Sequence, residues 1–254
     1  MSQDIQIFKE HFKGYDLNYR LIGGQACNIL LDNLGIEFRT TKDFDIILLV
    51  DKLNEELNEE FIKVFWDFIK KGRYEGIEQG EVFSNFYRFI KPRTENYPAM
   101  IELFSKSQLP EVEDYRITPI YISDDVSSLS AIVLDNEYYQ LLNEGAQVVD
   151  GISIISAPYL ILFKAKAWLD LKKRKEEGHQ VNSKSIEKHR KDVIRLWTTL
   201  ETEQEVTINE VIKGHINEFL IKIEQEDKDI SSLVPDISLS EIIADLKLLF
   251  KINE

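Results

Sequence analysis

The chain has 254 residues, of which 43% are hydrophobic, and it carries a formal net charge of -14 at pH 7. A chain of this length buries a substantial core, as one large domain or two smaller ones. No apolar run approaches the roughly 20 residues that a membrane-spanning helix requires, so we expect no membrane partner. Cys27 is the only cysteine, which excludes an intrachain disulfide, and the N-terminus has no basic or apolar leader; we therefore expect a cytoplasmic location.

The first predicted strand ends in two glycines. Leu21 and Ile22 form its apolar end, Gly23 and Gly24 follow, and residues 25–34 are predicted to form a helix. Glycine lets the backbone approach a phosphate closely, and the first turn of a helix offers amide groups and a positive dipole end to an anion. We interpret Gly23 and Gly24 as a phosphate-binding turn. Standing alone, the same pair would indicate a plain strand-to-helix turn.

The next predicted strand begins with two carboxylates. Side chains at alternate positions of a strand share a face, so Asp43 and Asp45 lie side by side while Phe44 faces the core. Residues 46–50 continue as an apolar run, which is typical of a strand buried on both faces. Two carboxylates this close repel each other unless a cation lies between them, and Mg²⁺ takes carboxylate oxygens together with substrate phosphates. The pattern therefore indicates a metal and phosphate site, although an Asp-x-Asp sequence also occurs in solvated turns.

Three polar residues precede this acidic pair: Arg39, Thr40 and Thr41 place a guanidinium and two hydroxyl groups beside it. The order Gly-Gly, a helix, then Arg-x-Thr-x-Asp-x-Asp opening an apolar strand resembles the nucleotidyltransferase fold of the polymerase-beta type. It resembles more closely the AbiEii-like nucleotidyltransferases, which are found as toxins of bacterial toxin-antitoxin and phage-defence systems. The resemblance implies that Asp43, Asp45 and a third carboxylate on a later strand hold divalent metal ions. It also implies a cognate antitoxin as a candidate partner.

The best candidate for the third carboxylate is Glu102, in the middle of the apolar segment 98–104. Ionised groups are rarely buried without a partner, and a metal ion would supply that partner. The alternative is an edge strand with one wet face, which would leave Glu102 in water. Given the upstream motif we favour the metal ligand, although the resembled proteins more often have aspartate at this position.

The segments around this strand are predicted to alternate between helix and strand. Residues 53–71 have the pattern of an amphipathic helix, and residues 82–90 that of a strand that pairs with the strand of the third carboxylate. Further short strands are expected at 117–122 and 152–155, with a short helix around 138–143.

From Pro158 onward the chain is predicted to be helical, with a basic run at 172–175 and a last helix at 239–252 that Ser240 caps. This region resembles a series found in AbiEii-like proteins, which consists of a proline, then Lys-x-x-Ala, then an arginine, then Lys-Asp. The corresponding residues are Pro158, Lys164, Ala167, Arg174, Lys191 and Asp192. The family often continues with an acidic residue three positions after that aspartate, where this chain has Arg195.

Two lysines of the first of these helices are candidates for contacting the nucleotide. Lys164 would meet phosphate oxygens as a point charge, and Lys166 is its rival, because helical spacing turns the two away from each other. Both could instead be the solvated side of an amphipathic helix. Lys191 and Asp192 are either an exposed pair or a group that orients Lys164, and we favour the second interpretation.

The sequence thus predicts an α/β (α+β) fold with two domains: an N-terminal nucleotidyltransferase-type mixed sheet flanked by helices (residues 1–156) and a C-terminal helical bundle (residues 157–254). The predicted activity is transfer of a nucleoside monophosphate from an NTP to an acceptor hydroxyl, assisted by one or two Mg²⁺ ions. The predicted catalytic residues are Asp43, Asp45, Glu102 and Lys164, of which the three carboxylates bind metal. The predicted nucleotide-binding residues are Gly23, Gly24, Arg39, Thr41, Lys191 and Asp192.

Two alternatives stay open: a phosphotransferase or modifier of the same fold, and a non-catalytic nucleotide-binding module. The acceptor is also open. The net charge repels nucleic acid as a whole, but residues 164–195 are rich in Lys and Arg, so a local basic groove could still accept a tRNA end. A protein or small-molecule acceptor fits the acidity equally well, and charge does not decide between them.

Overall fold

The computed structural model describes residues 2–39, 41–49, 55–80, 86–105, 117–120, 132, 135–201 and 204–252. Contacts between Cα atoms divide the chain into two compact units. The sheet unit consists of Met1–Ile122 and Ala146–Ile155, and the helical unit of Ser123–Gly145 and Ser156–Glu254. The described residues between 123 and 145, which we expected in the first domain, therefore group with the helices.

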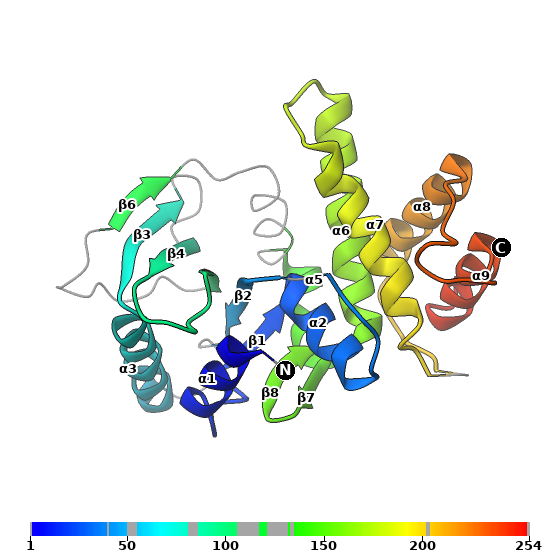
Figure 1. Cartoon of the computed structure of the whole chain (residues 1–254). Coiled ribbons are helices and arrows are strands. Elements are labelled where there is room, and N and C mark those ends of the chain that lie inside the picture. Colours follow the sequence, from blue (N-terminus) through cyan, green and yellow to red (C-terminus); the bar gives the residue numbers. More distant parts are fainter. Residues whose placement is uncertain are drawn as a thin grey trace. The chain divides into compact units, whose positions relative to one another are not determined.

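The sheet unit contains a mixed sheet, whose described strands have the order β6-β3-β4-β5-β2-β1-β8-β7 (Figure 1). These strands are β1 (Tyr19–Ile22), β2 (Asp43–Leu48), β3 (Tyr74–Gly80), β4 (Phe86–Pro92), β5 (Met100–Ser105), β6 (Ile117–Ile120), β7 (Ala146–Val149) and β8 (Ile152–Ile155). The described helices of this unit are α1 (Gln3–His11), α2 (Gly23–Asn33) and α3 (Glu55–Gly72). A mixed sheet with helices confirms the coarse α+β fold class, and the nucleotidyltransferase arrangement stays a prediction.

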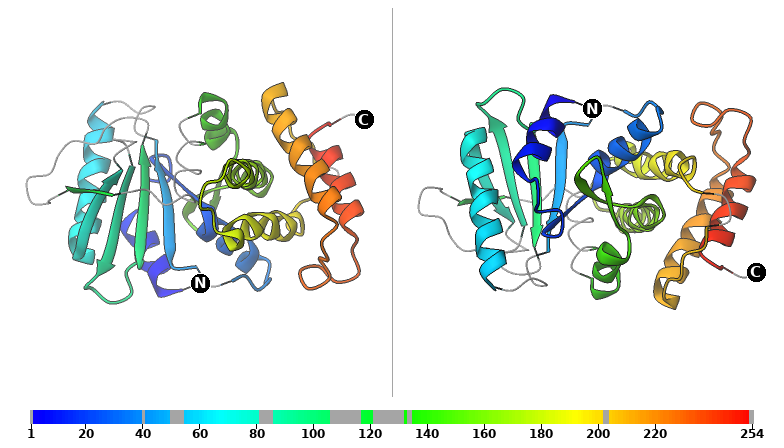
Figure 2. Two further views of the ribbon diagram at one scale, coloured as in Figure 1. Left: turned by 90° about the horizontal axis from the view of Figure 1, so that it is seen from above. Right: turned by 90° about the horizontal axis from the view of Figure 1, so that it is seen from below.

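One face of this sheet is covered by aromatic side chains of α1 and α3, and Figure 2 shows α3 running along the strands. Phe8 of α1 lies 5.3 Å from Phe44 of β2 and 5.7 Å from Phe68 of α3, measured between ring centroids. Phe89 of β4 lies 5.8 Å from Phe65 of α3. Because side chains alternate along a strand, the sequence neighbours of Phe44 lie on the opposite face of the sheet.

The local predictions for the sheet unit agree with the described elements. The apolar run of β2 is buried from Ile46 to Leu49, each residue being at most 2% exposed, and Val50 lies outside the described residues. The predicted helix 53–71 corresponds to α3, of which residues 53 and 54 are not described. The predicted strand 82–90 is described from Phe86 onward as β4, which pairs with β5 as expected, and the pairing is antiparallel.

The helical unit is built around α6. Its described helices are α5 (Asn136–Glu144), α6 (Ala157–Glu176), α7 (Ser183–Trp197), α8 (Glu210–Glu226) and α9 (Leu239–Leu249) (Figure 1). Trp168 of α6 is fully buried, 5.3 Å from the ring of Phe219 in α8. Tyr138 of α5 packs against Phe163 of α6 at 5.4 Å, which explains why the α5 segment groups with this unit. Among the described helices of both units, none has the length and apolar character needed to cross a membrane.

The start of α9 differs from the prediction. Ser238, and not Ser240, caps this helix, because the Ser238 hydroxyl accepts a hydrogen bond from the backbone of Glu241 while the Glu241 carboxylate accepts one from the backbone of Ser238. This reciprocal arrangement requires a serine three residues before the glutamate. Ser240 lies inside the first turn, so the predicted cap was wrong.

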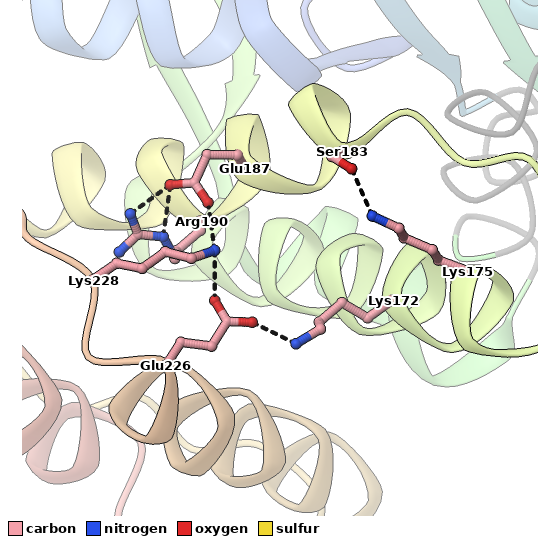
Figure 3. A network of polar contacts seen from close by, with 7 residues as sticks. All are labelled: Lys172, Lys175, Ser183, Glu187, Arg190, Glu226 and Lys228. Atoms are coloured by element: carbon pink, nitrogen blue, oxygen red, sulfur yellow. Dashed lines mark hydrogen bonds and ion pairs between the residues drawn. The ribbon is translucent and has the colours of Figure 1, made fainter.

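The basic run of α6 belongs to a network of ion pairs (Figure 3). Lys172 of α6 pairs with Glu226 at the end of α8, and Lys228 bridges Glu226 and Glu187 of α7 at 2.8 and 3.0 Å. The guanidinium of Arg190 donates to the same Glu187. Lys172 of the basic run thus connects α6 to the end of α8, and Lys228 extends the network from there to α7.

Candidate active site

Three charged side chains form a row across neighbouring strands. Arg88 of β4, Glu102 of β5 and Asp45 of β2 are register partners: Arg88 is opposite Glu102 in the antiparallel pair, and Glu102 is opposite Asp45 in the parallel pair. The row lies on the sheet face opposite Phe44, because Asp45 follows Phe44 directly along β2. Asp43 precedes it on the same face and is exposed, whereas Asp45 is half-buried.

Glu102 is the most buried carboxylate of this row, with 5% of its surface exposed. Its strand lies between β4 and β2, so the wet edge strand considered as an alternative was wrong. The Arg88 guanidinium donates from Nε and Nη2 to Glu102 Oε1 at 3.0 and 2.8 Å. Burial, followed by the negative charge of Asp45, raises the pKa of Glu102 to about 8, although Arg88 lowers it. The two neighbouring carboxylates are therefore a place where an added cation would be stabilised.

Gly23, the first residue of α2, allows the Asp45 carboxylate to lie against the point where β1 passes into α2. The residue has φ +66°, and a Cβ at this position would lie 1.7 Å from Asp45 Oδ2. Any side chain would thus be both strained and in collision with the carboxylate. We interpreted this glycine from the sequence as a close approach to phosphate; the structure adds a close approach to Asp45.

Gly24 lies beneath two of the predicted nucleotide-binding side chains. A Cβ at Gly24 would be 3.0 Å from Thr41 Oγ1 and 3.2 Å from Arg39 Nη2, so both groups stand over the first turn of α2. Ile22 precedes the helix, and its apolar side chain cannot accept hydrogen bonds from the amide groups of the first turn. A guanidinium, a hydroxyl and the helix N-terminus therefore share one place, a combination suited to an anion. Thr40 lies outside the described residues.

Two residues near this site were missed from the sequence. Arg88 was placed only on a predicted strand, because nothing in the local pattern specifies which residue of β4 faces Glu102. Gln25, the third residue of α2, is fully buried, and among the described residues neither its amide oxygen nor its amide nitrogen has a hydrogen-bond partner. The only signal for it was a polar residue between the glycines and the small apolar residues Ala26 and Cys27 at the start of the helix.

The remaining predicted residues lie in the helical unit. Lys164 of α6 donates to Asp192 of α7 at 2.9 Å, with side-chain exposures of 3% and 0%. The contact expected if Asp192 orients Lys164 is therefore present, and the interpretation of Asp192 as part of an exposed pair was wrong. Lys166 pairs at 2.7 Å with Asp170 of its own helix, and Lys191 is half-buried. The roles of Lys164, Lys191 and Asp192 toward a nucleotide stay predictions.

The carboxylates of the sheet unit have the chemistry that a magnesium site needs. Asp45 and Glu102 supply hard oxygen ligands at adjacent register positions, and Asp43 supplies another on the same strand face. The Asp45 carboxylate lies against Gly23, near the start of β2. In the described part of the chain, no three Asp, Glu, His or Cys side chains are gathered closely enough to form a metal-binding group. Carboxylate oxygens are thus the kind of ligand that a divalent cation prefers, and Glu102 accepts hydrogen bonds from Arg88 in this structure.

Comparison with protein-family models gives no match to this sequence, and a search of curated proteins gives none either. The resemblance to AbiEii-like nucleotidyltransferases therefore stays a prediction from the motifs.

Proposed function

We propose that this chain is a metal-dependent nucleotidyltransferase, which transfers a nucleoside monophosphate from an NTP to an acceptor hydroxyl. The observation that supports this best is the meeting of two groups of residues in the sheet unit. Asp45 lies against Gly23 and beside Glu102, and the side chains of Arg39 and Thr41 lie against the next residue, Gly24. The carboxylates proposed to bind metal and the groups proposed to bind anions thus meet at Gly23 and Gly24. This arrangement suits a triphosphate that is chelated by a metal ion.

Each side chain has a specific task in this proposal. The Arg39 guanidinium and the Thr41 hydroxyl bind non-bridging phosphate oxygens, and the first amide groups of α2 add further hydrogen bonds. The carboxylates of Asp43, Asp45 and Glu102 would hold one or two Mg²⁺ ions, which when bound stabilise the charge on the attacking and leaving oxygens. The carboxylate nearest the acceptor takes the proton of its hydroxyl group. The new bond forms between the acceptor oxygen and the α-phosphorus, and pyrophosphate leaves.

In the helical unit, we propose for Lys164 the phosphate-binding role that the family resemblance implies, with Asp192 as its positioning partner. The 2.9 Å ion pair and its burial support a fixed orientation of the lysine, since an unpaired buried charge is unfavourable. Lys191, the neighbour of Asp192, is proposed to contact the nucleotide from the same helix.

Labelled nucleotides test the proposed reaction. We expect Mg²⁺-dependent transfer of label from [α-³²P]NTP and none from [γ-³²P]NTP, with transfer abolished by Asp45→Asn and strongly reduced by Asp43→Asn. The matched control is Asp67→Asn, because Asp67 is a half-exposed residue of α3 that pairs with Lys71. Transfer of the γ label instead would identify a phosphotransferase of the same fold. Activity that survives both site variants would overturn the assignment.

A second candidate is a non-catalytic nucleotide-binding module, which one observation favours. Arg88 already supplies a cation to Glu102, so the third carboxylate has a partner without a metal ion. Calorimetry separates the two functions: the module binds each NTP equally well with and without Mg²⁺, whereas the transferase requires the ion for tight binding.

The proposed acceptors are a tRNA end, a protein or a small hydroxyl compound, and the proposed biological role is that of a toxin controlled by an antitoxin. Expression in a bacterial host tests this role. Growth arrest that Asp45→Ala abolishes would support it, and unimpaired growth at high expression would contradict it.

A further inference from the structure

Arg88 holds Glu102 through an unusual hydrogen-bond arrangement. Two hydrogen bonds of the Arg88 guanidinium, from Nε and from Nη2, converge on the single oxygen Oε1 of the carboxylate. The strongest arginine–carboxylate pairs instead use both oxygens in parallel. On the other side of Glu102, in the parallel pair of β5 with β2, lies Asp45. Glu102 is therefore shared between a guanidinium on one strand and the predicted metal-binding carboxylate on the next.

A second arginine–glutamate pair, between β3 and the residue after β4, provides a comparison. Arg93 donates to Glu75 at 2.8 Å, with side-chain exposures of 62% and 42%, whereas Arg88 and Glu102 are 16% and 6% exposed at the same distance. Exposed ion pairs are screened by water and contribute little, but partly buried charges interact strongly. The Arg88 guanidinium thus cannot leave Glu102 without large loss unless another anion receives it.

A divalent cation bound by Asp45 and Glu102 would compete with this guanidinium. The two positive groups repel each other, and each of them favours the same carboxylate. In the row of register partners, the carboxylates of Asp45 and Glu102 are neighbours of the Arg88 guanidinium, so a cation bound by both carboxylates would lie close to it. When the cation takes Glu102, the displaced guanidinium needs a new anion, and its planar fork matches phosphate oxygens.

We propose that Arg88 is a positioning residue that couples metal binding to triphosphate binding: it holds Glu102 away from the metal ion until a triphosphate accepts its guanidinium. This inference rests on the proposed function, because it assigns Glu102 to a metal ion and places the triphosphate beside the carboxylates. Metal alone then binds weakly, and metal together with triphosphate binds tightly. Because such a coupling is reciprocal, triphosphate also binds better when the metal is present, by the same factor.

The test measures this coupling with Mn²⁺ and inorganic triphosphate as probes, which removes any dependence on the base. Free Mn²⁺ is followed by its paramagnetic resonance signal, with and without triphosphate, after correction for the Mn²⁺–triphosphate complex in solution. In Arg88→Met, Mn²⁺ alone should bind more tightly than in the wild type, and the coupling factor should fall about tenfold. Arg93→Met should leave both quantities unchanged, since its partner Glu75 is well exposed.

Arg88→Lys keeps the charge but not the fork, so it should retain part of the coupling and also serves if Arg88→Met does not fold. Circular dichroism confirms folding of each variant. A coupling factor in Arg88→Met and Arg88→Lys equal to that of Arg93→Met would overturn the proposal, as would weaker binding of Mn²⁺ alone in Arg88→Met. Failure of the proposed function gives a different result: the coupling is present, but no α-phosphoryl label is transferred.

Discussion

Replacing Gly23 by alanine should move the Asp45 carboxylate away from the end of its strand. The new Cβ would lie 1.7 Å from Asp45 Oδ2 and 2.6 Å from its Cγ, whereas real Cβ atoms essentially never approach closer than 3.0 Å. The carboxylate must therefore shift by roughly an ångström, a displacement that costs about 10²-fold in rate when it affects a group that positions the reacting atoms. We expect a loss of about that size in nucleotidyl transfer.

Backbone strain is the second consequence of this substitution. At φ +66° alanine is less stable than glycine by about 1–2 kcal/mol. A domain with a free energy of unfolding of about 5–15 kcal/mol tolerates this loss, so the variant should stay folded.

Gly35→Ala is the matched control, because Gly35 has φ +70° and nothing within 4 Å of its added Cβ. It carries the same strain without the collision. Urea unfolding should show a loss of stability in both variants, while only Gly23→Ala should lose Mg²⁺-dependent transfer. Equal rates of transfer in the two variants would refute the reasoning that Gly23 is required for the position of Asp45.

Three further predictions concern buried polar groups. Because the pKa of Glu102 is raised from its ordinary 4.5 to about 8, the folded protein holds a proton that the unfolded chain has lost between these values, so its stability falls as pH rises through this window. The free energy of unfolding, measured with urea, should be lower at pH 8 than at pH 5 for the wild type but not for Glu102→Gln. The same change with pH in both proteins would contradict this expectation. Gln25→Met should raise the free energy of unfolding by about 1–3 kcal/mol, since it removes an unpaired buried amide; a lower melting temperature would show that the amide has a partner in solution. Lys164→Met should cost about 3–5 kcal/mol, because it removes the ammonium partner of the fully buried Asp192 carboxylate. Lys166→Met, whose ion pair is partly exposed, should cost under about 1 kcal/mol, and equal losses would disprove the distinction.

Properties that depend on one strand could be predicted from the sequence. The alternation of Asp43, Phe44 and Asp45 placed the carboxylates on one face, and the structure has Phe44 buried with the two aspartates more exposed. The charge of Glu102 within an apolar strand indicated a buried acid with a partner, and burial is found. Such features follow from the two-residue period of a strand and from the cost of burying a charge.

Properties that depend on register between strands could not be predicted. Arg88 is one of several residues of β4 that could face Glu102, and only the pairing of the two strands selects it. The collision with Asp45 of any side chain introduced at position 23 likewise depends on the pairing of β1 with β2. The sequence indicated a cation for Glu102, but it could not show that the protein supplies a guanidinium of its own.

The helical unit shows the same division between local and tertiary information. Pro158 marked the start of α6 correctly, because proline suits the first turn of a helix. For Asp192 the sequence favoured an orienting role toward Lys164 over an exposed pair, but a Lys-Asp pair in a helix is compatible with either. Its ion pair with Lys164, 28 residues earlier, is a contact between two helices and therefore requires the fold.

The central claim is that the carboxylates at the start of β2 promote transfer of the α-phosphoryl group. Pyrophosphate release, measured together with incorporation of [α-³²P] label and with added Mg²⁺, tests it most directly. The proposed reaction predicts that the two products appear in equal amounts in the wild type and in Asp67→Asn, and that Asp45→Asn produces neither. Equal pyrophosphate release by the wild type and Asp45→Asn would contradict it.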